Sequence, residues 1–207
     1  GSLVFSREYL VVPISDDSTI FPWDILKRST IGMENVRLVN NQESFPYKLD
    51  AVAVGCDFGI SGSVGADYSC FTVWGRDKNE IYYLLHIYRA KGMAYDEQVQ
   101  RIVMFYIFFR PNAVIVANNN FQSVLGSLVV DSGVKNLIRF TTTNNKKDLR
   151  SGWPSLSALF ERGVIKVPYH PDDRDKVNTM FGEFTSVAFR SDKGTLESIS
   201  GHADTLS

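Results

Sequence analysis

Hydrophobic and polar residues follow two different patterns along this 207-residue chain. Residues 1–48 hold short apolar pieces broken by prolines and polar loops, a pattern typical of a lead-in or linker. Within this segment only residues 23–28 predict a helix, because Pro22 is a good residue for a first helical turn. Residues 49–207 alternate strand-like apolar runs with stretches of helical periodicity, which predicts one ordered domain.

The predicted domain opens with three strands and continues with alternating helices and strands. The predicted strands are 51–56, 69–74, 80–89, 113–116, 137–141 and 164–167, and a closing hairpin joins 186–190 to 195–200. The predicted helices are 95–109, 122–131, 154–162 and 172–184, and residues 201–207 begin a further helix. Three leading antiparallel strands followed by helix–strand units predict an α/β fold: a ribonuclease H-like mixed β-sheet flanked by helices.

Asp57 ends the first strand-like run, AVAVGCD, and a Gly/Ser-rich turn follows it. A carboxylate at the end of a buried strand is held at the rim of a sheet, where it can bind a divalent metal ion. Aspartate also begins many turns. This segment alone therefore allows Asp57 to be either a metal ligand or a turn former.

Two-metal cleavage of a phosphodiester needs several carboxylates at one site. In a sheet of the predicted order they belong at the end of the first strand, after the central parallel strand, and at the start of the last helix. Asp57 has the first position and Asp204 has the third. Ala117, followed by three asparagines, stands at the second position, where an acid is expected.

Four segments of the chain resemble the C-terminal nuclease domain of viral large terminases, the motor-nucleases that package DNA into tailed-phage capsids. They are FSREYLVVPISDDSTIFP at 5–22, CDFGISGSVGADYSCFTVWG at 56–75, ANNNFQ at 117–122 and GHADTLS at 201–207. Each motif alone is weakly specific. All four occur in the family's order, on the expected elements, and together they cover nearly the whole chain.

The resemblance implies a metal-dependent DNA endonuclease that cuts concatemeric viral DNA by two-metal hydrolysis. It implies catalytic positions at Asp57, Ala117 and Asp204, with Asp57 and Asp204 as metal ligands. Asp67 is implied either to bind metal through water or to cap the turn. His202 is implied to be either a proton-transfer group beside the ligands or a structural loop residue. The implied cofactor is Mg²⁺ or Mn²⁺, as two ions in the active form.

The chain departs from the family pattern at two acidic positions. Ala117 stands where the family's Glu-x-Asn-x-Phe-Gln motif has its acid, and Ala203 stands at the first position of the closing Asp-Asp pair. We interpret Ala117 as an engineered inactivation and Ala203 as a second one; Gly1–Ser2 is typical of a cloning scar. This interpretation predicts an inactive nuclease that holds at most one weakly bound ion. A noncatalytic DNA-binding domain of the same fold would explain Ala117 equally well.

The charge of the chain is nearly balanced, with 22 Lys+Arg against 23 Asp+Glu. DNA binding must therefore come from a local patch rather than from the field of the whole molecule. Lys146, Lys147 and Arg150 form one candidate patch after a predicted strand, where they can reach phosphates without reading bases. A solvated loop has the same composition.

The resemblance also implies partners and a place of action. These are double-stranded DNA, the portal protein, the small terminase subunit and the ATPase domain of the same chain, in the cytoplasm of the infected host and transiently at the procapsid. We expect no membrane partner, because no apolar run is long enough to span a bilayer. Cys56 and Cys70 are expected to be small buried residues.

One alternative comes from another functional class. Actin-like ATPases and sugar kinases share this sheet core and also begin with a strand followed by an Asp and a Gly/Ser turn, so residues 57–63 could form a phosphate loop. The chain is too short for the two lobes of that family, and no second phosphate loop is visible.

Overall fold

The structure is a computed structural model that describes residues 19–32, 35–59, 68–117, 122–140, 152–190 and 195–198. Its helices are α2 (Trp23–Arg28), α3 (Tyr95–Phe109), α4 (Gln122–Asp131), α5 (Trp153–Glu161) and α6 (Arg174–Thr185), with short 3-10 turns η1 (Gln42–Ser44) and η3 (Pro171–Asp173). Its strands are β1 (Thr30–Ile31), β2 (Ala51–Asp57), β3 (Tyr68–Arg76), β4 (Tyr82–Lys91), β5 (Ala113–Ala117), β6 (Leu137–Phe140), β7 (Ile165–Pro168), β8 (Val187–Arg190) and β9 (Thr195–Ser198).

Seven strands form one mixed sheet in the order β1-β7-β4-β3-β2-β5-β6, and β8 and β9 form a separate hairpin. The three leading strands β2, β3 and β4 pair antiparallel. β5 then pairs parallel to β2 on its other side, and β6 pairs parallel to β5. This arrangement confirms the predicted α/β fold with a ribonuclease H-like mixed sheet.

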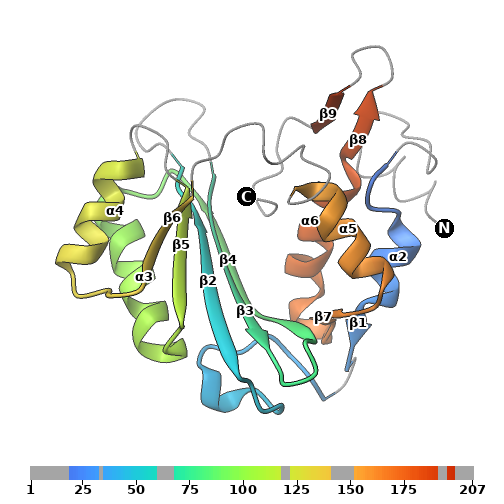
Figure 1. The fold of residues 1–207 in the computed structure, drawn as a ribbon, viewed down its shortest axis with the longest axis horizontal. Helices are drawn as coiled ribbons and strands as arrows, with labels where there is room; N and C mark the ends of the chain where they lie inside the picture. Colours follow the sequence, from blue (N-terminus) through green and yellow to red (C-terminus); the bar gives the residue numbers. More distant parts are fainter. Residues whose placement is uncertain are drawn as a thin grey trace.

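Helices flank the sheet, with α3 and α4 on one side and α2, α5 and α6 on the other (Figure 1). Alternate residues of β2 face α3. Val52, Val54 and Cys56 are buried and belong to the hydrophobic cluster that includes residues of α3. Successive side chains of a strand point to opposite faces. Gly55 and Asp57 therefore belong to the opposite face. We call it the open face because, among the described residues, the cluster formed by α2, α5 and α6 contains residues of β3, β4 and β7 but none of β2 or β5.

The described part of the segment assigned above to a lead-in packs against this domain. β1 pairs parallel with β7, and Ile20 N–H donates to the carbonyl of Val187 at 3.0 Å. Phe21 and Leu26 are fully buried in the second hydrophobic cluster, which also contains residues of α5 and α6. Burial of these two side chains ties the segment to the sheet through the hydrophobic effect.

The largest boundary difference from the sequence analysis is in β4, which begins and ends two residues later than predicted. The cause is the turn before it. Asp77 Oδ1 accepts hydrogen bonds from Asn79 N–H at 2.9 Å and Ile81 N–H at 3.0 Å, and Glu80 has φ 60°. These local bonds keep Glu80 and Ile81 in the turn, as Asp side chains commonly do. No described helix combines the length and apolar character required to cross a bilayer.

Candidate active site at the carboxyl ends of the central strands

Two of the three predicted catalytic positions are neighbours at one edge of the sheet. In the parallel pair of β2 and β5, Cys56 is in register with Val116. β2 ends one residue later at Asp57, and β5 ends one residue later at Ala117. Adjacent strands lie about 4.8 Å apart, and residues in register share a face. An acid at position 117 would thus stand beside Asp57 on the open face.

Asp57 also begins a row of residues that crosses the sheet. Asp57 is in register with Cys70 of β3, and Cys70 is in register with Arg89 of β4. Arg89 forms an ion pair with Glu183 of α6, with 2.8 Å between Nη2 and Oε1. The Cζ atom of Arg89 lies 3.4 Å from the centroid of the Tyr68 ring. A cation held by two partners therefore lies on the open face, two strands away from Asp57.

The chain directly after Asp57 is held by buried polar groups. Gly59 N–H donates to Ser69 Oγ at 3.0 Å, and Gln98 Nε2 donates to the carbonyls of Gly59 at 3.0 Å and Met93 at 3.1 Å. Gln98 lies on α3 and its side chain is fully buried. These bonds fix Gly59, two residues after Asp57, to β3 and α3.

Ser69 and Gln98 were not singled out from the sequence. A signal for Gln98 was available, because it precedes Val99 on the apolar side of the predicted helix 95–109, where a polar side chain needs a partner. Its partner, the carbonyl of Gly59, could not be read from the sequence because it lies 39 residues away.

The Cys56 thiol, next to Asp57, is not in the form that binds metal. Burial, with smaller effects of Cys70 and Asp57, raises the pKa of Cys56 far above its usual value. Cys56 is therefore a neutral thiol, whereas metal ligation requires the thiolate. Both cysteines are buried, as expected from the sequence. In the described ranges, no group of three His, Cys, Asp or Glu side chains lies close enough to hold a metal ion.

All of the remaining predicted site residues lie outside the described part of the chain. They are Asp67, Lys146, Lys147, Arg150, His202, Ala203 and Asp204. The structure therefore places positions 57 and 117 together and leaves the other assignments as predictions. His86 has a structural role: its Nδ1 lies 2.8 Å from the Val39 carbonyl oxygen, and its ring packs against Phe105.

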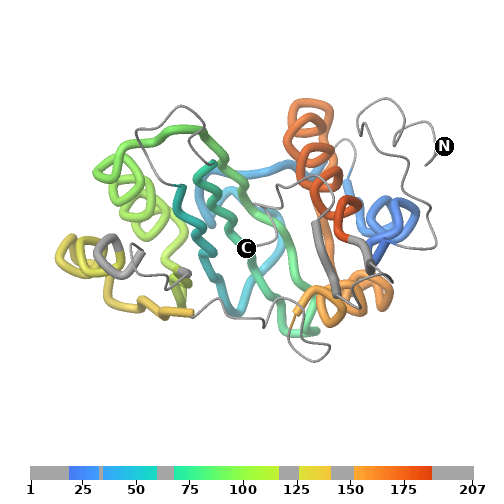
Figure 2. The backbone as a smooth tube through the Cα atoms, turned by 90° about the horizontal axis from the view of Figure 1, so that it is seen from above, coloured from blue at the N-terminus to red at the C-terminus, as the bar shows by residue number. Residues whose placement is uncertain are grey.

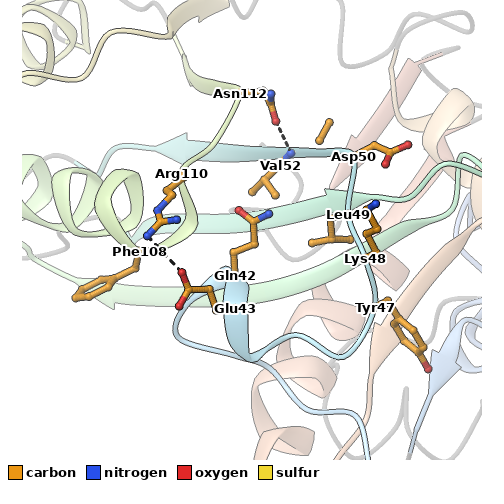
Figure 3. A pocket seen from close by; sticks show the side chains of 11 residues that line it. Gln42, Glu43, Tyr47, Lys48, Leu49, Asp50, Val52, Phe108, Arg110 and Asn112 are labelled. Atoms are coloured by element: carbon orange, nitrogen blue, oxygen red, sulfur yellow. Dashed lines mark hydrogen bonds and ion pairs between the residues drawn. The ribbon is translucent and has the colours of Figure 1, made fainter.

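A separate pocket of about 520 Å³ opens at the other end of β2 (Figure 3). In it Val52 N–H donates to Asn112 Oδ1 at 2.8 Å, and an exposed ion pair joins Arg110 to Glu43 at 3.3 Å. Its lining includes none of the predicted site residues. The candidate chemistry therefore lies at the carboxyl ends of β2 and β5, and not in this pocket.

Comparisons with known proteins point to one group of structures. No family model and no curated protein matches the sequence. The large terminase nuclease from thermophilic phage G20c superposes with a TM-score of 0.65 at 19% identity, covering 91% of this chain and 94% of that chain. The nuclease domain of the large terminase subunit gp2 of bacterial virus Sf6 gives a TM-score of 0.60 at 11% identity, over 91% and 96% of the two chains.

The HK97 bacteriophage large terminase also matches, with a TM-score of 0.60 at 10% identity, over 92% of this chain and 43% of that chain. The phage G20c nuclease has been solved with bound magnesium, cobalt and zinc, and a mutant Sf6 nuclease domain with manganese. The chain thus has the fold of large-terminase nuclease domains, the group that its four motifs resemble.

Proposed function

We propose that this chain is the nuclease domain of a viral large terminase, a metal-dependent endonuclease that cuts concatemeric DNA during genome packaging. The observation that carries the proposal is the neighbouring placement of positions 57 and 117 at the carboxyl ends of β2 and β5. The fold shared with several phage terminase nucleases supports it. The test is divalent-dependent cleavage of supercoiled DNA after an acid is placed at position 117.

The donor set fits Mg²⁺ or Mn²⁺ only in part. Asp57 is a hard oxygen donor at the rim of the sheet, as these ions prefer. Asp204 is the proposed second ligand, with Asp67 reaching an ion through water. Position 117 offers no donor in this chain, so a ligand that two ions would share is missing. When bound, the ions would polarise the scissile phosphate and lower the pKa of the attacking water.

The remaining proposed roles belong to the chain's own residues. Asp57 is proposed to hold the metal ion from the end of β2. Two residues further on, Gly59 is held by its N–H bond to Ser69 Oγ and by the bond that Gln98 donates to its carbonyl. His202 is proposed to accept or donate a proton beside the ligands, next to Ala203. The proposed partners are double-stranded DNA, the portal protein, the small subunit and the attached ATPase domain, in the infected host cell and at the procapsid.

Calorimetric titration should show at most one weakly bound divalent ion in this chain, with Mn²⁺ favoured over Mg²⁺. Mg²⁺ demands near-octahedral geometry, which two carboxylates satisfy less well than three. The isotherm should steepen in Ala117→Glu and flatten in Asp57→Ala. Two well-ordered ions in the present sequence would show that the site does not depend on position 117, and an ion bound away from Asp57 would contradict the site itself.

The loop patch of Lys146, Lys147 and Arg150 should bind DNA weakly and without sequence preference. Three phosphate contacts would contribute about −2.7 to the slope of log K against log salt. Lys146→Ala combined with Lys147→Ala should make the slope shallower by about 1.8, equally on two unrelated duplexes. A loss confined to one sequence would mean that the loop reads bases and would contradict the assignment.

A further inference from the structure

A groove lies between α3 and α6. These two helices flank β4 from its two sides (Figure 2). We call the groove between them the α3–α6 groove. It has a volume of about 580 Å³ and is lined from β4 by His86–Arg89, from α3 by Arg101, and from α6 by Lys176 and Thr179. Tyr68 also lines it.

The groove exists because β4 is longer than the strand beside it. β7 pairs with β4 only at Tyr82 and Tyr83, and Val39 N–H donates to the Leu85 carbonyl at 2.8 Å. Beyond these contacts, no described strand pairs with this edge of β4. An edge left open between two helices forms a trough whose floor is the strand itself.

The groove carries positive charge. The Cζ atom of Arg101 lies 3.9 Å from the centroid of the Tyr88 ring, and Lys176 is exposed on α6. In the part of the chain that the structure describes, neither side chain forms a salt bridge, and Asp175 is the one acid in the lining. A guanidinium stacked on a ring still presents its N–H groups in its own plane, the geometry that phosphate oxygens accept.

Both cations line the groove together with His86. Burial is the main cause that lowers the pKa of His86, and the positive charges of Lys176 and Arg101 lower it further, against an opposing effect of Asp173 and the bond to Val39. His86 therefore stays neutral near pH 7, and the charge of the groove comes from the arginine and the lysine.

The groove adjoins the row of residues in register with Asp57, because Arg89, the last residue of that row, also lines the groove. Arg89, stacked on Tyr68, is two strands from Asp57, a separation of about 10 Å at 4.8 Å per strand. That is about three steps of a DNA duplex at 3.4 Å each. A DNA strand with its reacting phosphate at Asp57 can therefore continue across the ends of β3 and β4 into the groove.

We propose that the α3–α6 groove binds the sugar-phosphate backbone of DNA whose reacting phosphate lies at Asp57, with Arg101 and Lys176 as the phosphate contacts. The proposal rests on the nuclease function proposed above. An acidic peptide would also match the charge of the groove. DNA is favoured because the groove is in line with Asp57.

The experiment compares the double variant Arg101→Gln/Lys176→Gln with Lys27→Gln/Lys78→Gln, which loses the same charge from exposed positions on α2 and on the β3–β4 turn. Binding of a labelled 30-base-pair duplex is followed by fluorescence anisotropy across a KCl series. The groove variant should have a slope shallower by about 1.8, and the control should keep the slope of the unchanged chain. If the double variant unfolds, Lys176→Glu, at an exposed position, should still reduce the slope by at least about 0.9.

Equal slopes for the groove variant and the control would overturn the proposal. So would a labelled octaglutamate peptide that binds more tightly than the duplex and depends on Arg101 and Lys176, because the groove would then dock a protein. Nicking by Ala117→Glu separates the two proposals. No nicking by Ala117→Glu, alone or combined with Ala203→Asp, together with a shallower slope rejects the nuclease function and keeps the groove as a DNA-binding surface, whereas restored nicking with unchanged slopes rejects the groove alone.

Discussion

Ala117→Glu should restore divalent-dependent nicking of supercoiled DNA, at a rate at least about 100-fold above that of the present sequence. The reason is the register of β2 and β5, which makes position 117 the neighbour of Asp57 on the open face. A carboxylate there would bind metal and compensate charge in the transition state, and losing one such preorganised group typically costs 10²–10³ in rate. The assay is conversion of supercoiled plasmid to nicked circles with Mn²⁺ or Mg²⁺.

Further variants make this result specific. Ala117→Gln has the same shape as the glutamate without its charge and should stay inactive. Asp57→Ala in the Ala117→Glu background should abolish the restored activity. If Ala117→Glu and Ala117→Asp are both folded, metal-bound and inactive, position 117 is not a catalytic position; if activity also needs Ala203→Asp, the closing pair is altered as well.

Phe71→Ala should lower the free energy of unfolding by about 3–5 kcal/mol, the usual cost of truncating a buried phenylalanine. Phe71 is 0% exposed and lies in the middle of the sheet, with its ring 6.3 Å from Phe58 and 6.2 Å from Phe105, centroid to centroid. The measurement is urea unfolding followed by circular dichroism.

Phe140→Ala is the matched control, because the side chain of Phe140 on β6 is 45% exposed and leaves no cavity when truncated. Its cost should stay below about 1 kcal/mol. A Phe71→Ala cost as small as that of Phe140→Ala would mean that the packing of β3 against α3 does not hold the domain together.

The sequence alone was sufficient for elements whose signals are local. α3 and α4 have the predicted bounds 95–109 and 122–131, because helical periodicity and a terminating Pro111 or Gly133 are read within one or two turns. Strand alternation and the order of elements likewise predicted the ribonuclease H-like sheet, and four motifs predicted the group of structures that the fold matches.

Only the tertiary structure decided which residues meet. The sequence placed Asp57 at the end of a strand and Ala117 after another, but their adjacency comes from the register of β2 with β5. The bond from Gln98 to Gly59 and the ion pair of Arg89 with Glu183 join residues far apart in the chain. Such pairs depend on how whole elements pack, and no local pattern encodes their partners.

The α3–α6 groove has the same origin. The apolar composition of β4 predicted a strand. It gave no indication that pairing with β7 would end at Tyr83, or that α3 and α6 would flank the unpaired edge. Arg101 and Lys176 are ordinary exposed cations on two helices when seen in the sequence. They form one positive surface only because packing on opposite faces of the sheet brings those helices to the same edge of β4.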